Sequence, residues 1–440
     1  MTGDRPASPY RAESAEEDSK QNPSGYVERV IARARELRAG DAFEAPEGTV
    51  SMRISAARSK AVARAQRRNW RRVTLAFGVV GGLLAAFSLF LPYVGFDFMG
   101  IGSRIYSPQD VLDCYDLWFR MNVLPLFDPA LANRTGQMFS EFVIGHPSGM
   151  YTLVMNRAAA TVIVVLCGAL LGVSGLLFQA SFKNPLATPS MLGVSDGVML
   201  GCIAYTLLGH TSIADDPKLY VLLVYGCGAA AVAFVILCSR TLSGAKRYNV
   251  LDMLLLGTVV AQLLSGIGSF VQNFIMDYDT WEQFYDVQQG ADALSQPIVQ
   301  LFAVAVFLLT MVPAIVLSFK MNLISFSDEE GRMMGVRAGL LRGVALLLGS
   351  AMQLAAMATV GAVAMLSLAV PFLVRYIMPA DFRSQMVGNC LIGAEFLLAC
   401  VVIQHFAIVD SITMPVGTIV SIFIVPFFIW MVAFGQGKWR

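Results

Sequence analysis

The stretch FQASFKNPLATPSMLGVSDG, residues 178–197, separates two strongly apolar stretches and decides how the chain around it folds. Pro185 has no backbone N–H to donate, and its ring pushes Asn184 out of the helical region of backbone space. A second proline follows at position 189. We therefore predict that one helix ends in this stretch and that the two prolines position the next one.

The composition indicates that lipid is the main solvent of this chain. Of its 440 residues, 56% are hydrophobic and 14% are charged, against about 25% charged in an ordinary soluble domain. A helix needs about 20 apolar residues to cross a bilayer. The predicted fold is an all-α, polytopic membrane protein with about ten transmembrane helices, at residues 73–95, 158–181, 190–209, 218–239, 250–274, 297–318, 340–360, 363–379, 386–405 and 411–434.

The first 71 residues differ from the rest. They are polar and contain no apolar core of a signal peptide, and Pro, Ser, Glu and Asp dominate residues 1–25. We predict two regions: a basic, partly disordered cytoplasmic extension over 1–71 and a membrane domain over 72–440. Residues 52–72 hold eight basic residues and no acid. An anchor beside the first span explains this run better than a nucleic-acid-binding arm does.

The charges between the spans alternate in sign. Residues 276–296 hold five acids and no base, and residues 97–150 hold six acids against three arginines. Cytoplasmic loops of membrane proteins carry an excess of Lys and Arg, so both termini are predicted to be cytoplasmic. The segments placed inside by this rule carry Lys183, Arg240, Lys246, Arg247, Lys320, Arg332, Arg337, Arg342, Arg375, Arg383, Lys438 and Arg440.

Three further segments have recognisable patterns. In the long outer segment 97–150, Ser107 and Gln109 are predicted to start a short amphipathic helix on the membrane surface. Glycines at 168, 172 and 175 put small residues on one helical face, which lets helices approach closely in lipid. In the inner segment 320–339, Ser327 can cap a helix that begins at Asp328. That segment suits either a helix that docks on a cytoplasmic partner or a plain solvated loop.

The segment from Gly168 to Gly197 resembles the signature of the permease subunits of FecCD-type ABC importers, a family for iron-siderophores, haem and vitamin B12. MNLISFSDEEGRMMGV, residues 321–336, is similar to the family's cytoplasmic coupling segment, and MPVGTIVSIFIVPFFIW, from Met414, is similar to its last span. The resemblance covers about residues 73–434 in the right order. The signature positions are Gln179, Asn184, Pro185, Leu186, Ala187, Pro189, Leu192, Gly193 and Val194.

The resemblance implies a permease that works with other chains. The sequence contains no GxxxxGK[ST] motif to hold ATP phosphates, so energy must come from a partner. The implied partners are two ABC ATPase subunits, which bind ATP and Mg, a second permease copy or paralogue, and an extracellular or periplasmic solute-binding protein. No cofactor, metal or nucleic acid is expected on this chain itself, and the implied location is the bacterial cell membrane.

The resemblance also assigns roles to residues. Gln179, Asn184, Pro185 and Leu186 would form the inner signature turn, as scaffold. Arg157, together with the acidic outer loops, would meet the binding protein. The ATPase contact would be made by Ser327, Asp328, Glu329, Gly331, Arg332, Gly335 and Val336.

Two departures from the family pattern concern the ligand and the docking partner. The family usually has Pro-His after the apolar run of the eighth span, where this chain has Pro371-Phe372, and His405-Phe406 stands near the end of the ninth span. An iron-siderophore is the first choice of substrate, with haem and cobalamin left open.

Three acids fall in or near predicted spans, where an ionised carboxylate is costly. Asp252 lies near an inner end and can reach water. Asp196 can cap its helix or pair with Lys183, and it is also a candidate to line the transport pathway. Glu395 lies in the middle of its span and either lines the transport pathway or pairs within a permease dimer.

Other functional classes are weaker matches. An ion-coupled secondary transporter would need several ionisable groups near the midplane. A membrane-embedded metalloenzyme is disfavoured because the seven cysteines and three histidines show no ligand spacing. A helix-packing scaffold without a transport role is the remaining alternative.

Overall fold

The computed structural model describes residues 73–89, 108–123, 135–146, 150–242, 250–290, 292–326, 333, 335–378, 381–406 and 414–434. Within these ranges every regular element is a helix, which confirms the predicted all-α class. The predicted extension 1–71 lies outside the described residues and stays a prediction.

Each of the ten predicted spans contains an apolar helix. Among the described residues, six helices are long and apolar enough to cross a membrane, and four are shorter apolar helices. In chain order they are Val73–Leu89, α7 (Met150–Phe182), α8 (Val194–Leu207), α9 (Pro217–Leu242), α10 (Val250–Phe274), α12 (Pro297–Phe326), α14 (Ala338–Val360), α15 (Ala364–Ile377), α16 (Phe382–Phe406) and α17 (Val416–Phe434).

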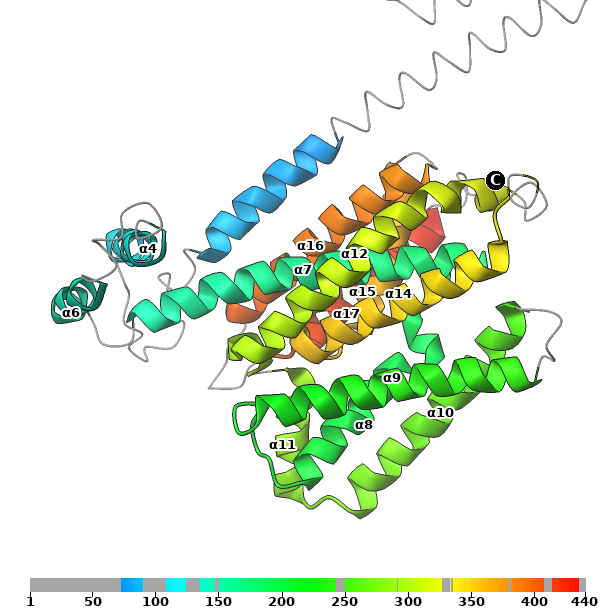
Figure 1. The fold of residues 1–440 in the computed structure, drawn as a ribbon, viewed down its shortest axis with the longest axis horizontal. Coiled ribbons are helices and arrows are strands. Elements are labelled where there is room, and N and C mark those ends of the chain that lie inside the picture. Colours follow the sequence, from blue (N-terminus) through cyan, green and yellow to red (C-terminus); the bar gives the residue numbers. More distant parts are fainter. Residues whose placement is uncertain are drawn as a thin grey trace, which may run out of the picture. The chain divides into compact units, whose positions relative to one another are not determined.

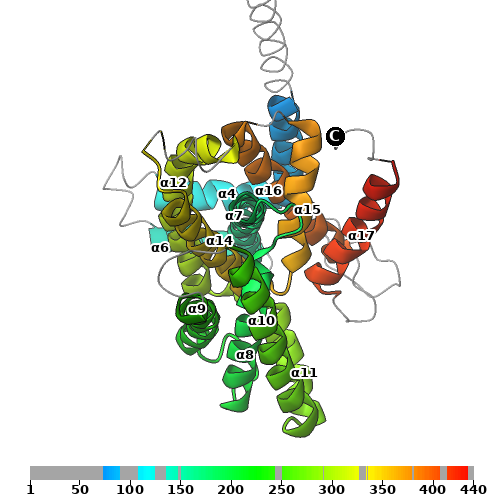
Figure 2. The ribbon, with the colours of Figure 1, turned by 90° about the vertical axis from the view of Figure 1, so that its right-hand side faces the viewer.

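Helix α7 lies at the centre of one group of helices, and Figure 2 shows it end-on between α12, α14, α15 and α16. Most of its second half is buried. The reason is the predicted row of glycines. A Cβ added at Gly168 would overlap the Gly393 carbonyl of α16, and one added at Gly175 would overlap the Ser367 carbonyl of α15. The absence of side chains therefore lets two helix backbones touch α7, as predicted.

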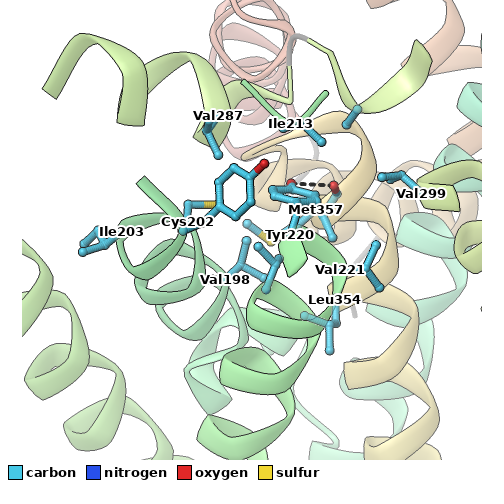
Figure 3. Packing of buried hydrophobic residues seen from close by; sticks show 14 of the residues in the cluster. Val198, Cys202, Ile203, Ile213, Tyr220, Val221, Val287, Val299, Leu354 and Met357 are labelled. Carbon is cyan, nitrogen blue, oxygen red and sulfur yellow. Dashed lines mark hydrogen bonds between the residues drawn. The ribbon is translucent and has the colours of Figure 1, made fainter. Parts of the chain in front are cut away.

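A second group consists of α8, α9, α10 and the short helix α11 (Tyr278–Gln289), which Figure 1 shows together. Its core is a cluster of apolar side chains from α8, α9 and α14 (Figure 3). Tyr220, only 1% exposed, donates its hydroxyl to the Ala358 carbonyl at 2.8 Å. Ala358 belongs to the last four residues of α14, whose carbonyls lack partners in their own helix. The tyrosine therefore joins α9 to the end of α14.

Replacing Tyr220 with Phe is expected to lower the free energy of unfolding by about 1–2 kcal/mol, because it leaves a buried carbonyl without its donor. Thermal unfolding of the detergent-purified protein measures this change. Tyr285→Phe is the matched control, since Tyr285 is 37% exposed on α11. An equal loss of stability in both variants would contradict the assigned hydrogen bond.

In the described part of the chain, three amphipathic helices lie outside the apolar stretches: α4 (Pro108–Asn122), α6 (Thr135–Gly145) and α11. The helix predicted near Ser107 is confirmed as α4, whereas α6 and α11 were not anticipated. Two predicted ends were also wrong. Helix α7 begins at Met150 instead of residue 158, and α12 continues to Phe326 instead of ending at residue 318. The inner segment predicted at 320–339 is shortened by the two final turns of α12.

Candidate functional site

The signature turn closes the end of α7 with its own backbone. The Asn184 N–H bonds to the Gln179 carbonyl at 3.2 Å, a six-residue bond typical of helix ends, and Lys183 between them has a left-handed φ of 49°. Asn184 Oδ1 accepts the N–H of Leu186 at 3.0 Å, so its side chain turns the chain through Pro185. These contacts suit the scaffold role predicted for the turn.

Gln179 ties the signature to a second helix. Its side chain is 2% exposed, and Nε2 donates to the Leu368 carbonyl of α15 at 3.2 Å. Gln179 therefore holds the C-terminal end of α7 against α15 from inside the bundle, while Leu186 is 55% exposed at the turn.

The second half of the quoted stretch starts the next helix in two steps. A short 3-10 helix, η3 (Pro189–Leu192), is followed by Gly193 with a left-handed φ of 74°, and α8 then begins at Val194. Gly193 occupies the cap position, and Asp196 lies in the first turn of α8. The prediction that Asp196 caps this helix is therefore wrong. Its position in the first turn places its carboxylate near the positive end of the helix dipole instead.

The predicted ATPase contact falls mostly on Ser327, Asp328, Glu329, Gly331 and Arg332, which lie outside the described residues. The described part begins again at Met333, which is 86% exposed. Gly335 follows with a left-handed φ of 78°, then Val336, and Arg337 occupies the N-cap position of α14 without a side-chain cap bond. The segment connects the C-terminal end of α12 to the N-terminal end of α14. A force applied to the segment would therefore act directly on two long helices.

The predicted outer end of the bundle is acidic on two segments that are far apart in sequence. Ser212 Oγ, in the loop between α8 and α9, donates to Asp292 Oδ2 at 2.6 Å, which joins that loop to the segment after α11. Backbone N–H groups of Ser212 and Thr211 hold the pKa of Asp215 below its usual range. Burial, and then the neighbouring Asp292, raise the pKa of Asp286.

Helix α11 is the element of this end that sequence reasoning missed. Asp277 caps it by accepting the Thr280 N–H at 3.1 Å, and Gly290 ends it with φ 68°. An Asp before a first turn that holds another acid, Asp279, is a helix-start signal that was available in the sequence. Trp281 and Tyr285 stack on each other along α11 and are both exposed.

Arg157 lies within α7, about two turns from its N-terminal end, and is half-buried. Its carbonyl accepts the Thr161 hydroxyl at 2.9 Å, and the Thr161 hydroxyl also contacts Ser88 Oγ at 3.0 Å. Arg157 therefore lies beside the contact between α7 and the helix Val73–Leu89.

Glu395 lies between α16 and the helix Val73–Leu89. The side chain is 9% exposed, and a Cβ at Gly81 would lie 3.0 Å from both its Cγ and its Oε1. Among the described residues Oε1 has no hydrogen-bond partner. Asp196 belongs to α8, in the other group of helices, so the structure does not bring these two predicted pathway acids together.

Phe372, at the position where the resemblance would place a histidine, is 7% exposed in α15. Its ring meets Phe428 of α17 edge-on, with centroids 5.4 Å apart. The phenylalanine therefore serves as an apolar contact between α15 and α17.

The apolar helices packed round a glycine-lined central helix define a polytopic α-helical membrane protein. Residues 126–434 match the sequence model of the FecCD transport family, and the chain belongs to that family. It is thus a membrane transport component rather than an enzyme, as the resemblance of the signature predicts.

Several curated proteins are similar to this chain. An iron chelatin transport system permease protein of Helicobacter pylori is 28% identical over 62% of this chain and 80% of its own length. The hemin transport system permease protein of Yersinia pestis is 30% identical over 63% and 81%. The vitamin B12 import system permease protein of Klebsiella pneumoniae is 27% identical over 64% and 82%.

A solved structure has a similar fold. It is described as an inward-facing conformation of a metal-chelate type ABC transporter, with a TM-score of 0.61 and 20% sequence identity. The match covers 83% of this chain and 99% of the other. At 20% sequence identity, the similarity between the two structures supports a shared fold and carries no conclusion about function.

Proposed function

We propose that this chain is the permease subunit of a binding-protein-dependent ABC importer for an iron(III)-siderophore or a related iron chelate. The observation that carries the proposal is the family match over residues 126–434. The iron and hemin permeases among the similar proteins support the choice of an iron-containing substrate. The vitamin B12 permease keeps cobalamin as the competing substrate.

In this proposal the chain performs no chemistry. Two copies form the path, two ATPase subunits on the cytoplasmic side supply the work, and a binding protein delivers the substrate outside. ATP-driven closure of the ATPases acts on the segment between α12 and α14 and switches the bundle between two states of rigid helices. Both termini are cytoplasmic, and the acidic end formed by Ser212, Asp292 and α11 faces the binding protein.

The test is uptake into liposomes that contain this permease and its ATPase. Labelled iron-siderophore, haem and cobalamin are offered in parallel, each with its binding protein. The proposal is supported if the siderophore is the only one of the three substrates taken up and if this uptake is lost when the Walker lysine of the ATPase is replaced. Uptake of only haem or cobalamin overturns the choice of substrate, and uptake without a working ATPase overturns the importer class.

Charge reversal in the coupling segment is expected to abolish ATP-driven uptake. The variants are Glu329→Lys and Arg332→Glu, which change the charges that an ATPase surface would recognise while leaving the apolar spans intact. Membrane insertion is measured by fractionation and uptake by the liposome assay.

Lys246→Glu is the control for these variants, because it reverses a charge in another segment placed inside by the same rule. This control is expected to transport normally. Normal uptake in both coupling variants would remove Glu329 and Arg332 from the ATPase contact.

A further inference from the structure

The end of α12 is joined to the start of α16 by a small polar and aromatic contact. Asn322 Nδ2 donates to Asp381 Oδ1 at 2.6 Å, and Asn322 Oδ1 accepts the Phe382 N–H at 2.8 Å. One turn earlier on α12, the Phe319 ring lies 3.7 Å from the Arg383 guanidinium carbon. We call these four side chains, Phe319, Asn322, Asp381 and Arg383, the α12–α16 latch.

The latch lies at the start of α16, where backbone N–H groups are available to bind another helix. The first N–H groups of a helix have no partner within it, and Asn322 satisfies that of Phe382 from a different helix. Asp381 directly precedes α16 and accepts the Ser384 backbone N–H at 3.4 Å, as a helix cap does, and it also accepts the Ser384 hydroxyl at 3.1 Å. Asp381 therefore has two roles: it caps its own helix and it binds α12.

The contact continues into the bundle. Met311, on the same side of α12 as the latch, lies against Cys390 of α16 with their sulfur atoms 4.0 Å apart. Further along α16, Gly393 meets the glycine row of α7 backbone to backbone. Helix α16 is thus packed between α12 and the central helix, and it cannot shift without moving along both.

The latch lies close to the segment that is proposed to contact the ATPase. Asn322 lies one turn before the end of α12 at Phe326, and the segment proposed to receive the ATPase follows at residue 327. The sequence places α16 after α15, with no direct link to this segment. A displacement of the segment reaches α14 through the chain itself, but it reaches α16 through packing contacts, among which the latch lies nearest to the end of α12.

We propose that the α12–α16 latch transmits the ATPase-driven displacement from α12 to α16, with Asn322 and Asp381 as its positioning residues. This inference rests on the proposed function, because it assumes that force enters between α12 and α14. Besides α12 and α14, the ATPase-driven displacement would then also move α16, and α16 would pass the movement to α7 through the contact of Gly393 with the glycine row. Coupling through a continuous set of packed and hydrogen-bonded groups is the physical requirement for such transmission.

The two side chains allow an exchange experiment. Asn322→Asp places a second carboxylate against Asp381 and removes the donor, so the latch opens. Adding Asp381→Asn restores a donor and an acceptor in swapped positions, and asparagine still caps α16. The measured quantity is the number of substrate molecules taken up per ATP hydrolysed by the assembled importer in liposomes.

The N322D importer is expected to hydrolyse ATP but to transport about tenfold fewer molecules per ATP, a size typical of coupling between neighbouring side chains. The N322D/D381N importer is expected to recover most of the wild-type ratio. Should N322D assemble poorly, Asn322→Ala replaces it, because it opens the latch without adding a charge.

Ser384→Ala is the matched control, since it removes a hydroxyl bond to the same carboxylate and leaves both bonds of Asn322 in place. It is expected to keep the wild-type ratio. The inference is overturned if N322D keeps that ratio, if the exchanged pair fails to restore it, or if S384A loses it equally. Failure of the proposed function looks different, because the wild-type complex then shows no ATP-driven uptake at all.

Discussion

Gly175→Ala is expected to prevent stable folding of this protein, although it adds a single methyl group. The added Cβ would overlap the carbonyl oxygen of Ser367 and lie 3.0 Å from the ring of Pro371 on α15. Backbone atoms cannot swing aside as a flexible side chain can, so α7 and α15 must separate. Overpacking of this kind costs about 1–3 kcal/mol and sometimes more. The nearby bond from Gln179 to Leu368 would lengthen with the same movement.

The matched controls for G175A are helical glycines that face open space. A Cβ at Gly226 of α9 or at Gly266 of α10 meets nothing within 4 Å. Since alanine favours a helix over glycine by about 1 kcal/mol, G226A and G266A should be as stable as the wild type or slightly more so. Thermal unfolding in detergent and the amount recovered from membranes measure the difference. If G175A unfolds at the same temperature as G226A, the close approach of α7 and α15 is wrong.

The glycine contact shows which part of the fold the sequence could predict. Gly168, Gly172 and Gly175 mark a close approach because their spacing puts them on one face of a helix. The partners of that face, such as Ser367, are nearly two hundred residues away, and no local pattern names them. Apolar stretches likewise marked the places of ten apolar helices in the described residues, six of them long enough to cross a membrane, since hydrophobic length is a local property.

The missed features share a different physical cause. Helices α6 and α11 are short and amphipathic, so their residues lack the continuous apolar run that marks a span. The hydrogen bond between Asn322 and Asp381 joins residues 59 positions apart. The contact between Gly81 and Glu395 joins the first described helix to the ninth predicted span. In the sequence Glu395 is an acid in the middle of a span, and only the packing shows that it faces the helix Val73–Leu89.

Glu395→Lys is expected to be the most damaging charge change in the membrane domain. Glu395 is level with the glycine row in the middle of α16, because the neighbouring residues Gly393 and Ala394 contact Gly168 of α7. A lysine there cannot extend its ammonium group to water at either end of the helix. The facing helix, Val73–Leu89, has no acidic residue to pair with it. A lysine at the centre of a membrane helix costs about 2.5–3.5 kcal/mol on insertion scales.

Glu395→Gln separates this electrostatic cost from any function of the carboxyl group. Glutamine keeps the size and hydrogen-bonding capacity of a neutral carboxyl group, so E395Q should be as stable as the wild type in thermal unfolding, whereas E395K should be lost from membranes. Substrate uptake by E395Q then separates a role of the carboxyl group in transport from a packing role against Gly81. Uptake at the wild-type rate means that the carboxyl group is a packing element against Gly81. Loss of uptake in a folded E395Q protein means that the carboxylate acts in transport, and normal stability of E395K would contradict the burial described for this side chain.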